Sequence, residues 1–246
     1  YGKRRDITYP WERTNAPPAG LSINSRYRKI LVVGASGFLG TRLVERLTLD
    51  LNTNVRVAIH RPETAARLGR LPVEYVQCDL LEQDQVMKCV EGCDVVVNCA
   101  RDRGGDSKRT LDVLVRGTQN LLEAAARYNV KKLVHISSAA VHGFKHKSRI
   151  VDESTPLRLS FNPYVRGKIK AEQLVMRYAE RLRVVILRPT LIYGPFSPDW
   201  VTDIVERLRN QRVTLIGEGK LANLVFVDDV VNSILLAIDR DDANGK

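Results

Sequence analysis

The stretch GASGFLG, residues 34–40, decides the fold. Its glycines stand at every third position, directly after the apolar run KILVV (29–33) and at the start of the helical pattern FLGTRLVERL (38–47). Between a strand and a helix, such glycines allow a tight turn, a close approach to a pyrophosphate and close helix–strand packing, while the helix amino terminus offers free N–H groups to the phosphates. We therefore expect a dinucleotide-binding loop whose contact residues are Gly34, Ser36, Gly37, Phe38, Leu39 and Gly40.

Short β-branched runs alternate with longer amphipathic stretches along the chain. The predicted strands are residues 29–34, 54–59, 73–78, 94–99, 132–137, 183–188 and 213–217. Strands that are apolar on both faces and separated by helices are typical of a parallel sheet covered on both sides. The sequence therefore predicts an α/β fold, a Rossmann-type doubly wound parallel sheet.

Composition narrows the class of protein. The 246 residues carry a formal net charge of +11, but the 39 Lys and Arg residues are scattered and only 6% of residues are aromatic, which disfavours nucleic acid and favours an anionic small ligand. No run of apolar residues approaches the ~20 needed to span a membrane, and the amino end lacks the apolar core of a signal peptide. The four cysteines lack metal-ligand spacing, so we interpret them as core thiols, expect no metal site, and predict a cytoplasmic location.

The second predicted strand bears on the choice of cofactor. It ends VAIHRP, with His60 and Arg61 where a site that prefers NAD usually has an acid for the ribose 2′-hydroxyl. A guanidinium there would neutralise a 2′-phosphate, so Arg61 favours NADP, although it would equally suit a solvated loop. Asp79, after the third strand, is placed either to contact the adenine edge or to cap the next helix.

A tyrosine and a lysine four residues apart indicate the chemistry. The run NPYVRGKIKAEQLVMRYAERL reads as a helix with Asn162 as its amino cap and Pro163 in its first turn, which stacks Tyr164 and Lys168 on one face. An ammonium one turn away stabilises a phenolate and lowers the pKa of the tyrosine from its ordinary value near ~10. The pair suits proton transfer to or from an alcohol during hydride transfer to a nicotinamide.

The fifth predicted strand ends HISSAAVHG, which puts two serines at the carboxyl edge, where open α/β sheets bind ligands. With the motifs CDL, VRGTQNLLEAA, YVRGK, LRPTLIYGP and NLVFVDDVV, in that order, the chain resembles the extended short-chain dehydrogenase/reductases, the NAD(P)-dependent epimerase/dehydratase group. The resemblance covers about residues 29–239. It implies a catalytic triad of Ser138 (rather than Ser137), Tyr164 and Lys168. It also implies that the cofactor is lined by Asp79, Leu80, Cys99, Ala100, Tyr164, Lys168 and Pro189.

The resemblance also sets out domains and an activity. Residues 1–28, with NAPPAG, many arginines and no periodicity, read as a tail or linker. The resemblance implies an NAD(P)-binding Rossmann domain over 29–188 and a small, incomplete C-terminal substrate lobe over 189–246, in which Asp228 and Asp229 would cap a helix. The expected activity is hydride transfer between a secondary alcohol and a ketone, as net reduction or as epimerisation through a keto intermediate. The substrate would be a sugar nucleotide or another hydroxylated small molecule, anionic or nucleotide-linked, and the resemblance implies a homodimer. The alternative is a non-catalytic NADP(H) sensor or scaffold.

Two departures from the family pattern limit the choice of substrate. Sugar-nucleotide 4,6-dehydratases carry Thr-Asp-Glu where this chain has Ser138-Ala139-Ala140, and without those acids we exclude their chemistry. Many sugar-nucleotide epimerases have an arginine where Ala222 stands, which weakens that assignment. Three arginines near the predicted cleft are candidates to replace it, although a solvated loop position is the favoured interpretation of each: Arg101, Arg103 and Arg158.

Overall fold

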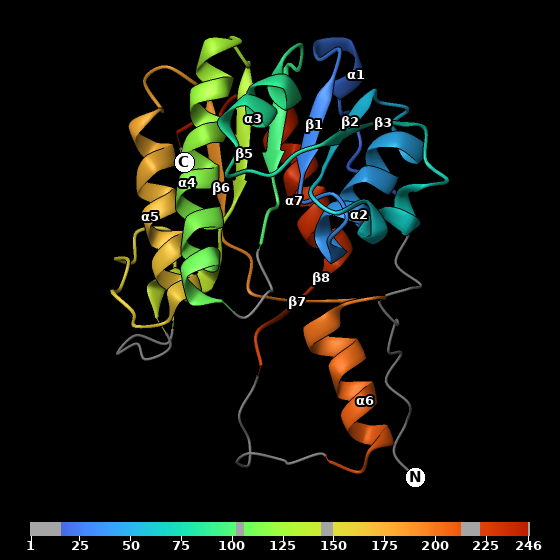
Figure 1. Cartoon of the computed structure of the whole chain (residues 1–246), viewed down its shortest axis with the longest axis vertical. Coiled ribbons are helices and arrows are strands. Elements are labelled where there is room, and N and C mark those ends of the chain that lie inside the picture. Colours follow the sequence, from blue (N-terminus) through green and yellow to red (C-terminus); the bar gives the residue numbers. More distant parts are fainter. Residues whose placement is uncertain (1–15, 102–105, 144–149, 213–221, 246) are drawn as a thin grey trace.

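Six parallel strands form one sheet in the order β3-β2-β1-β4-β5-β6 (Figure 1). The structure, a computed structural model, describes residues 16–101, 106–143, 150–212 and 222–245. The strands are β1 (Ile30–Val33), β2 (Val55–Ile59), β3 (Val73–Gln77), β4 (Val95–Asn98), β5 (Lys132–Ile136) and β6 (Val184–Leu187). Six of the seven predicted strands are thus confirmed, and the seventh, 213–217, lies outside the described residues.

The strand order places the crevice of the sheet. Ile30 of β1 pairs with Val55 of β2 on one side and with Val95 of β4 on the other. Because successive connections run in opposite directions from β1, the sheet opens a crevice beyond the carboxyl ends of β1 and β4, where ligands of such sheets bind. The doubly wound architecture predicted from the alternating runs is confirmed.

Helices cover both faces of the sheet. One layer holds α1 (Ile23–Arg26), α2 (Phe38–Glu45) with its π-helical extension η1 (Arg46–Asp50), and α7 (Val227–Asp239). The opposite layer holds α3 (Gln83–Val90), α4 (Ser107–Arg127) and α5 (Pro163–Arg177). All four residues of β1 and of β4 are buried, as expected for strands covered on both sides.

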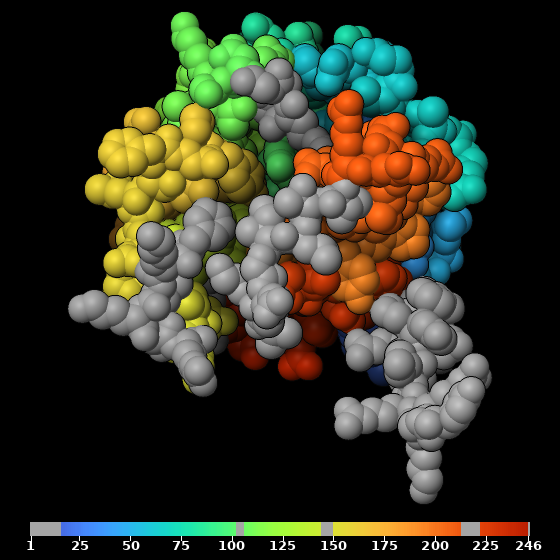
Figure 2. Space-filling view, turned by 90° about the horizontal axis from the view of Figure 1, so that it is seen from below, coloured from blue at the N-terminus to red at the C-terminus, as the bar shows by residue number. Residues whose placement is uncertain are grey.

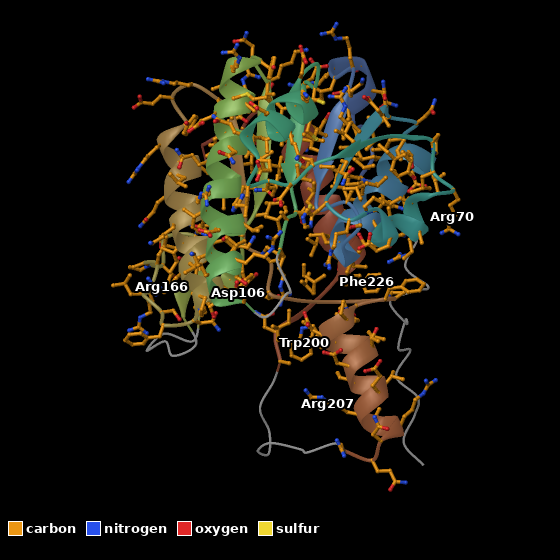
Figure 3. All side chains as sticks on the ribbon, in the orientation of Figure 1. Arg70, Asp106, Arg166, Trp200, Arg207 and Phe226 are labelled. Carbon is orange, nitrogen blue, oxygen red and sulfur yellow. The ribbon has the colours of Figure 1, made fainter. Side chains whose placement is uncertain are left out.

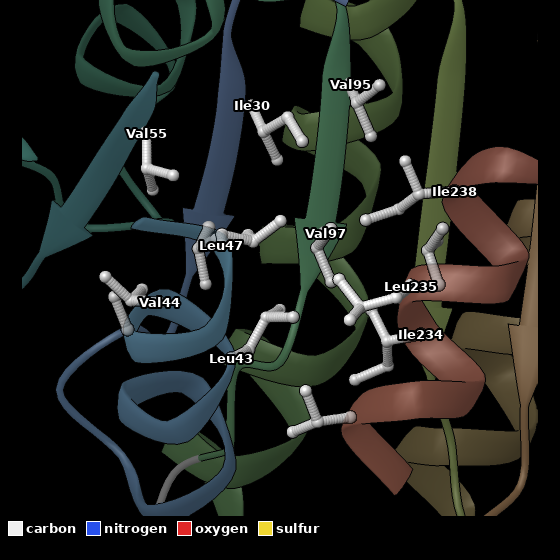
Figure 4. Packing of buried hydrophobic residues seen from close by; sticks show 14 of the residues in the cluster. Ile30, Leu43, Val44, Leu47, Val55, Val95, Val97, Ile234, Leu235 and Ile238 are labelled. Carbon is white, nitrogen blue, oxygen red and sulfur yellow. The ribbon is translucent and has the colours of Figure 1, made fainter. Parts of the chain in front are cut away.

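The last described helix, α7, packs against the sheet rather than within a substrate lobe. Its Ile234, Leu235 and Ile238 are fully buried in the cluster formed with β1, β4 and α2 (Figure 4). The sequence analysis expected Asp228 to cap this helix, but the capping position is occupied by Phe226. Instead Asp228 accepts two hydrogen bonds from Arg42 of α2, at 2.6 and 2.9 Å. This contact joins α2 and α7 within the layer.

A smaller set of elements lies beyond the carboxyl ends of the strands (Figure 1). It contains the parallel pair β7 (Leu191–Tyr193) and β8 (Leu224–Phe226), the turn η4 (Pro198–Thr202), and α6 (Asp203–Arg209). None of the described helices combines the length and apolar character required to cross a bilayer. At the other end of the chain, Ile23 and Tyr27 are buried, so part of the predicted tail belongs to the core. The division of the chain into three domains stays a prediction.

Candidate active site

The glycine loop between β1 and α2 is shaped by backbone contacts. Gly34 has φ +73°, and a Cβ there would lie 2.9 Å from the backbone of Cys99 and Ala100. A Cβ at Gly40 would lie 2.2 Å from the carbonyl oxygen of Gly34. The residue before α2 is Gly37, and no side chain caps this helix. The loop therefore leaves a bare backbone and an uncapped helix amino terminus, which fits a pyrophosphate.

The tyrosine and lysine lie together at the carboxyl end of β5. As predicted, α5 begins after Asn162, whose side chain accepts hydrogen bonds from the N–H groups of Tyr164 and Val165. Lys168 is 3% exposed, and its Nζ lies 6.0 Å from the centroid of the Tyr164 ring. The same ammonium donates a hydrogen bond of 2.6 Å to the carbonyl of Ile136, the last residue of β5.

The two serines after β5 have different surroundings. Ser138 precedes the 3₁₀ turn η3 (Ala139–His142), and its Oγ accepts from the N–H of Ala140 at 3.3 Å. Ser137 is 3% exposed, and its Oγ has no hydrogen-bond partner among the described residues. The partly exposed Ser138 thus lies at the edge of the crevice, whereas Ser137 points into the interior.

The predicted cofactor-lining residues after β4 and β6 lie at the same edge. Cys99 and Ala100 contact the glycine loop, as the spacing at Gly34 shows. The carbonyl of Pro189 accepts a hydrogen bond of 3.0 Å from the N–H of Ala139, which draws the end of β6 against the serine turn. Next to Pro189, Arg188 binds the buried Glu172 of α5 at 2.8 Å. Direct contacts thus join the residues after β4 to the glycine loop, and those after β6 to the serine turn.

The electrostatics of this edge follow from burial. Desolvation lowers the pKa of Lys168 from 10.5 to about 8 and raises the pKa of the Cys99 thiol to about 12. Glu172, one turn after Lys168, is already bound by Arg188 and favours the charged form of Lys168 only weakly. The lysine can therefore carry or release a proton near neutral pH.

A cluster of charged groups lies at the far side of the glycine loop. His60 and Arg109 approach the carboxylate of Asp79 at 3.2 and 3.6 Å. The helix α3 begins after Glu82, so the interpretation of Asp79 as its cap is wrong; Asp79 Oδ1 accepts instead from the N–H of Leu81. Arg61 is exposed at the end of β2. Leu80 is buried against Gly117 of α4, and its carbonyl accepts a hydrogen bond of 2.7 Å from Asn120 of the same helix.

Arg101, for which the sequence analysis favoured a solvated loop position, lies beside Tyr164 at the candidate site. Its guanidinium carbon lies 5.1 Å from the centroid of the Tyr164 ring, and its Nη1 lies 3.0 Å from Oδ2 of Asp199 on η4. The signal available in the sequence was its position two residues after a strand that ends at the ligand-binding edge. Figure 2 looks onto this face of the molecule, with the segment around α5 in yellow and the segment around α6 in orange.

Within the described residues, no group of three or more His, Cys, Asp and Glu side chains is arranged to hold a metal ion. A doubly wound sheet with a glycine cradle at its first turn and a Tyr-Lys pair on the helix after β5 is the arrangement of the short-chain dehydrogenase/reductases. Within that class, residues 30–246 match the sequence profile of the NAD dependent epimerase/dehydratase family, and the chain belongs to this family.

Relatives of known activity include reductases and epimerases. The chain is 31% identical to the 2-alkyl-3-oxoalkanoate reductase of Shewanella oneidensis, over 84% of this chain and 56% of that protein. It is 29% identical to the N-acetyl-alpha-D-glucosaminyl-diphospho-ditrans,octacis-undecaprenol 4-epimerase of Escherichia coli O157:H7, over 83% and 61% of the two chains. The UDP-glucuronic acid 4-epimerase of Bacillus cereus, solved with UDP-glucuronic acid and NAD, superposes with a TM-score of 0.76 at 26% identity, over 87% and 74% of the chains. The chain thus spans about three fifths of the length of these two curated relatives.

The buried Lys168 predicts a pH-dependent difference in stability. Because its pKa falls from 10.5 to about 8 on folding, the unfolded chain binds more protons between these values. The wild type should therefore gain stability relative to Lys168→Met as the pH rises from about 8 to about 10.5, by about 3 kcal/mol in total. Urea unfolding of both proteins across this range measures the difference, and Lys170→Met, on the exposed side of α5, is the matched control. A difference that stays constant with pH would contradict the expectation.

Proposed function

We propose that the chain binds NADP(H) and interconverts a secondary alcohol and a ketone. The observation that supports this most is the placement of Lys168: it is buried, one turn from Tyr164, and hydrogen-bonded to Ile136, the last residue of the strand that precedes Ser138. Tyr164 then transfers a proton to or from the substrate oxygen, Lys168 stabilises the phenolate, and Ser138 hydrogen-bonds to the same oxygen. When bound, the nicotinamide supplies or accepts the hydride.

The residues present suit a dinucleotide. The glycine loop and the amino terminus of α2 would hold the pyrophosphate, and the backbone after β4 and Pro189 after β6 would flank the nicotinamide. Lys168 would also contact the nicotinamide ribose. The glycines support this assignment because a Cβ at Gly34 or Gly40 would clash with backbone atoms of the chain, so the tight turn and the close approach of α2 to β1 both depend on glycine.

We favour net reduction over epimerisation as the overall reaction. A 2-alkyl-3-oxoalkanoate reductase is among the relatives, and Ala222 stands where many sugar-nucleotide epimerases carry an arginine. The printed activities of the 4-epimerases support the second candidate, epimerisation through a keto intermediate, which uses the same three residues. A product analysis that finds inverted alcohol without net cofactor turnover would favour the second.

Arg61 provides the test of cofactor preference. It is exposed at the end of β2, on the side of the loop where His60 and Arg109 already surround Asp79. Arg61→Ala should weaken NADPH binding by about 10- to 100-fold, because a charge-assisted contact to the 2′-phosphate is lost, and should change NADH binding little. Parallel fluorescence titrations at fixed salt measure both constants.

The control for that titration is Arg70→Ala, which removes the same charge from an exposed site at the edge of the sheet (Figure 3). It should leave the NADPH to NADH ratio as in the wild type. Equal binding of the two cofactors by the wild type would refute the NADP assignment and leave the dinucleotide site standing. Binding of neither would refute the proposed function itself.

A further inference from the structure

Arg101 links the sheet edge to the outer segment directly over Tyr164. It follows β4, and its partner Asp199 lies on η4, 98 residues later in the chain. Its guanidinium carbon is 5.1 Å from the Tyr164 ring centroid, while Lys168 Nζ lies 6.0 Å from the same centroid. Two cations therefore flank the side chain that would exchange a proton with the substrate.

The two cations differ in what they can still bind. Lys168 is buried and donates to the carbonyl of Ile136, so its position is fixed by the sheet. The side chain of Arg101 is 48% exposed and that of Asp199 is 37% exposed. Exposed ion pairs contribute little to stability, so an incoming anion can replace Asp199 at small cost. Arg101 also presents a planar fork of N–H donors, which matches the two oxygens of a carboxylate.

The position of Arg101 indicates where on a substrate a carboxylate that binds it would stand, relative to the reacting carbon. A substrate oxygen bound at the Tyr164 hydroxyl is at the edge of the ring over which the guanidinium lies. Because the guanidinium lies over the same ring, a carboxylate carried close to the reacting carbon is within its reach. One intervening carbon lets the carboxylate and the reacting oxygen point to the same side.

We propose that Arg101 binds the carboxylate of the substrate, and that the substrate is a 3-hydroxy or 3-oxo acid. This rests on the proposed function, because it takes Tyr164 as the group that meets the reacting oxygen. The rest of the substrate is apolar. Leu159 and Phe161, just before α5, are 97% and 101% exposed, and Trp200 follows Asp199, so exposed apolar side chains stand in the segments that precede Tyr164 and follow the partner of Arg101.

The test compares an acid with its neutral ester. Racemic 3-hydroxydecanoate and its methyl ester are oxidised with NADP⁺, and kcat/KM is measured for each with the wild type and with Arg101→Gln. The wild type should prefer the acid by about 10- to 100-fold, since hydrogen bonds between charged groups contribute that much. Arg101→Gln should bring the ratio of acid to ester close to one. Arg101→Lys, which keeps the charge and loses the fork, should fall between them.

The matched control is Arg166→Gln. Arg166 lies near the amino-terminal end of α5, two residues from Tyr164, and is exposed (Figure 3). The variant removes the same charge near Tyr164 but leaves Arg101 in place, so its ratio of acid to ester should equal that of the wild type. A fall of the ratio in this variant would attribute the preference to the general positive charge of the protein and overturn the role of Arg101.

The remaining outcomes distinguish a wrong carboxylate assignment, a wrong substrate class and a wrong proposed function. Equal use of acid and ester by the wild type, or a fall in both rates in Arg101→Gln at an unchanged ratio, overturns the carboxylate assignment while the proposed function stands. Turnover of neither compound by protein that binds NADPH overturns the substrate class. Failure to bind NADPH at all overturns the proposed function, and the titration is therefore done first.

Discussion

Gly40→Ala is expected to remove cofactor binding and to destabilise the fold. The added Cβ would lie 2.2 Å from the Gly34 carbonyl oxygen and 2.8 Å from the Cα of Ala35, and both are backbone atoms that have no rotamer to change. The helix α2 must therefore move away from the loop after β1. We expect a loss of about 3 kcal/mol or more in the free energy of unfolding, at the upper end for overpacking. Urea unfolding measures this, and NADPH fluorescence titration should show no saturable binding.

The control for Gly40→Ala is Gly37→Ala, three residues earlier in the same loop. Gly37 has an ordinary φ of −76°, and a Cβ there would meet only the Gly34 carbonyl oxygen, at 3.2 Å. The variant should fold with nearly wild-type stability and still bind NADPH more weakly, because its methyl group stands where the phosphates approach the uncapped helix. Wild-type stability in Gly40→Ala would contradict the packing argument. Unchanged NADPH affinity in Gly37→Ala would refute the phosphate site.

The sheet and the reacting pair were predictable because both depend on short-range patterns. Runs such as 94–99 are β-branched and apolar on both faces, which only a strand in a covered parallel sheet accommodates. The glycine loop lies between such a run and a helical pattern, and the four-residue spacing of Tyr164 and Lys168 requires only that the segment be helical. The amino cap at Asn162 was readable for the same reason, since a cap is a local contact.

Several errors of the sequence analysis concern long-range contacts. The helix α7 has an evident apolar face, but nothing in residues 227–239 states that this face meets β1 and α2 rather than a substrate lobe. Asp228 read as a capping residue because it lies in a first helical turn, whereas its partner Arg42 is 186 residues away. The strands β7 and β8 have three residues each, too few for a periodicity to be recognised.

Arg101 was set aside for the same physical reason. As a residue in a charged loop, Arg101 resembled many solvated arginines. Its proximity to Tyr164 depends on which strand lies beside β4. Since β4 pairs with β5, and the helix after β5 carries Tyr164, the loop after β4 meets the tyrosine. That adjacency is a property of strand order, which the sequence states only indirectly.

Tyr164→Phe is expected to lower kcat by about 10²- to 10⁴-fold, the range found for a lost acid–base group. Phenylalanine keeps the ring that Arg101 and Lys168 approach at 5.1 and 6.0 Å, so packing and charge around the site are retained. Only the hydroxyl is lost, and NADPH affinity should therefore change little. Turnover of a panel of secondary alcohols and ketones, with NADPH titration of the same preparation, separates the two effects.

Tyr178→Phe is the matched control, since Tyr178 caps the carboxyl end of α5, whereas Tyr164 lies in its first turn. It should retain wild-type turnover and wild-type NADPH affinity. If Tyr164→Phe also retained its turnover, another group would be the acid–base, and the role assigned to the tyrosine would be wrong. If the wild type bound NADPH tightly and turned over no member of the panel, no catalytic activity could be assigned to Tyr164, Lys168 and Ser138. The cofactor-sensing alternative would then be favoured, because tight binding without turnover is its distinguishing property.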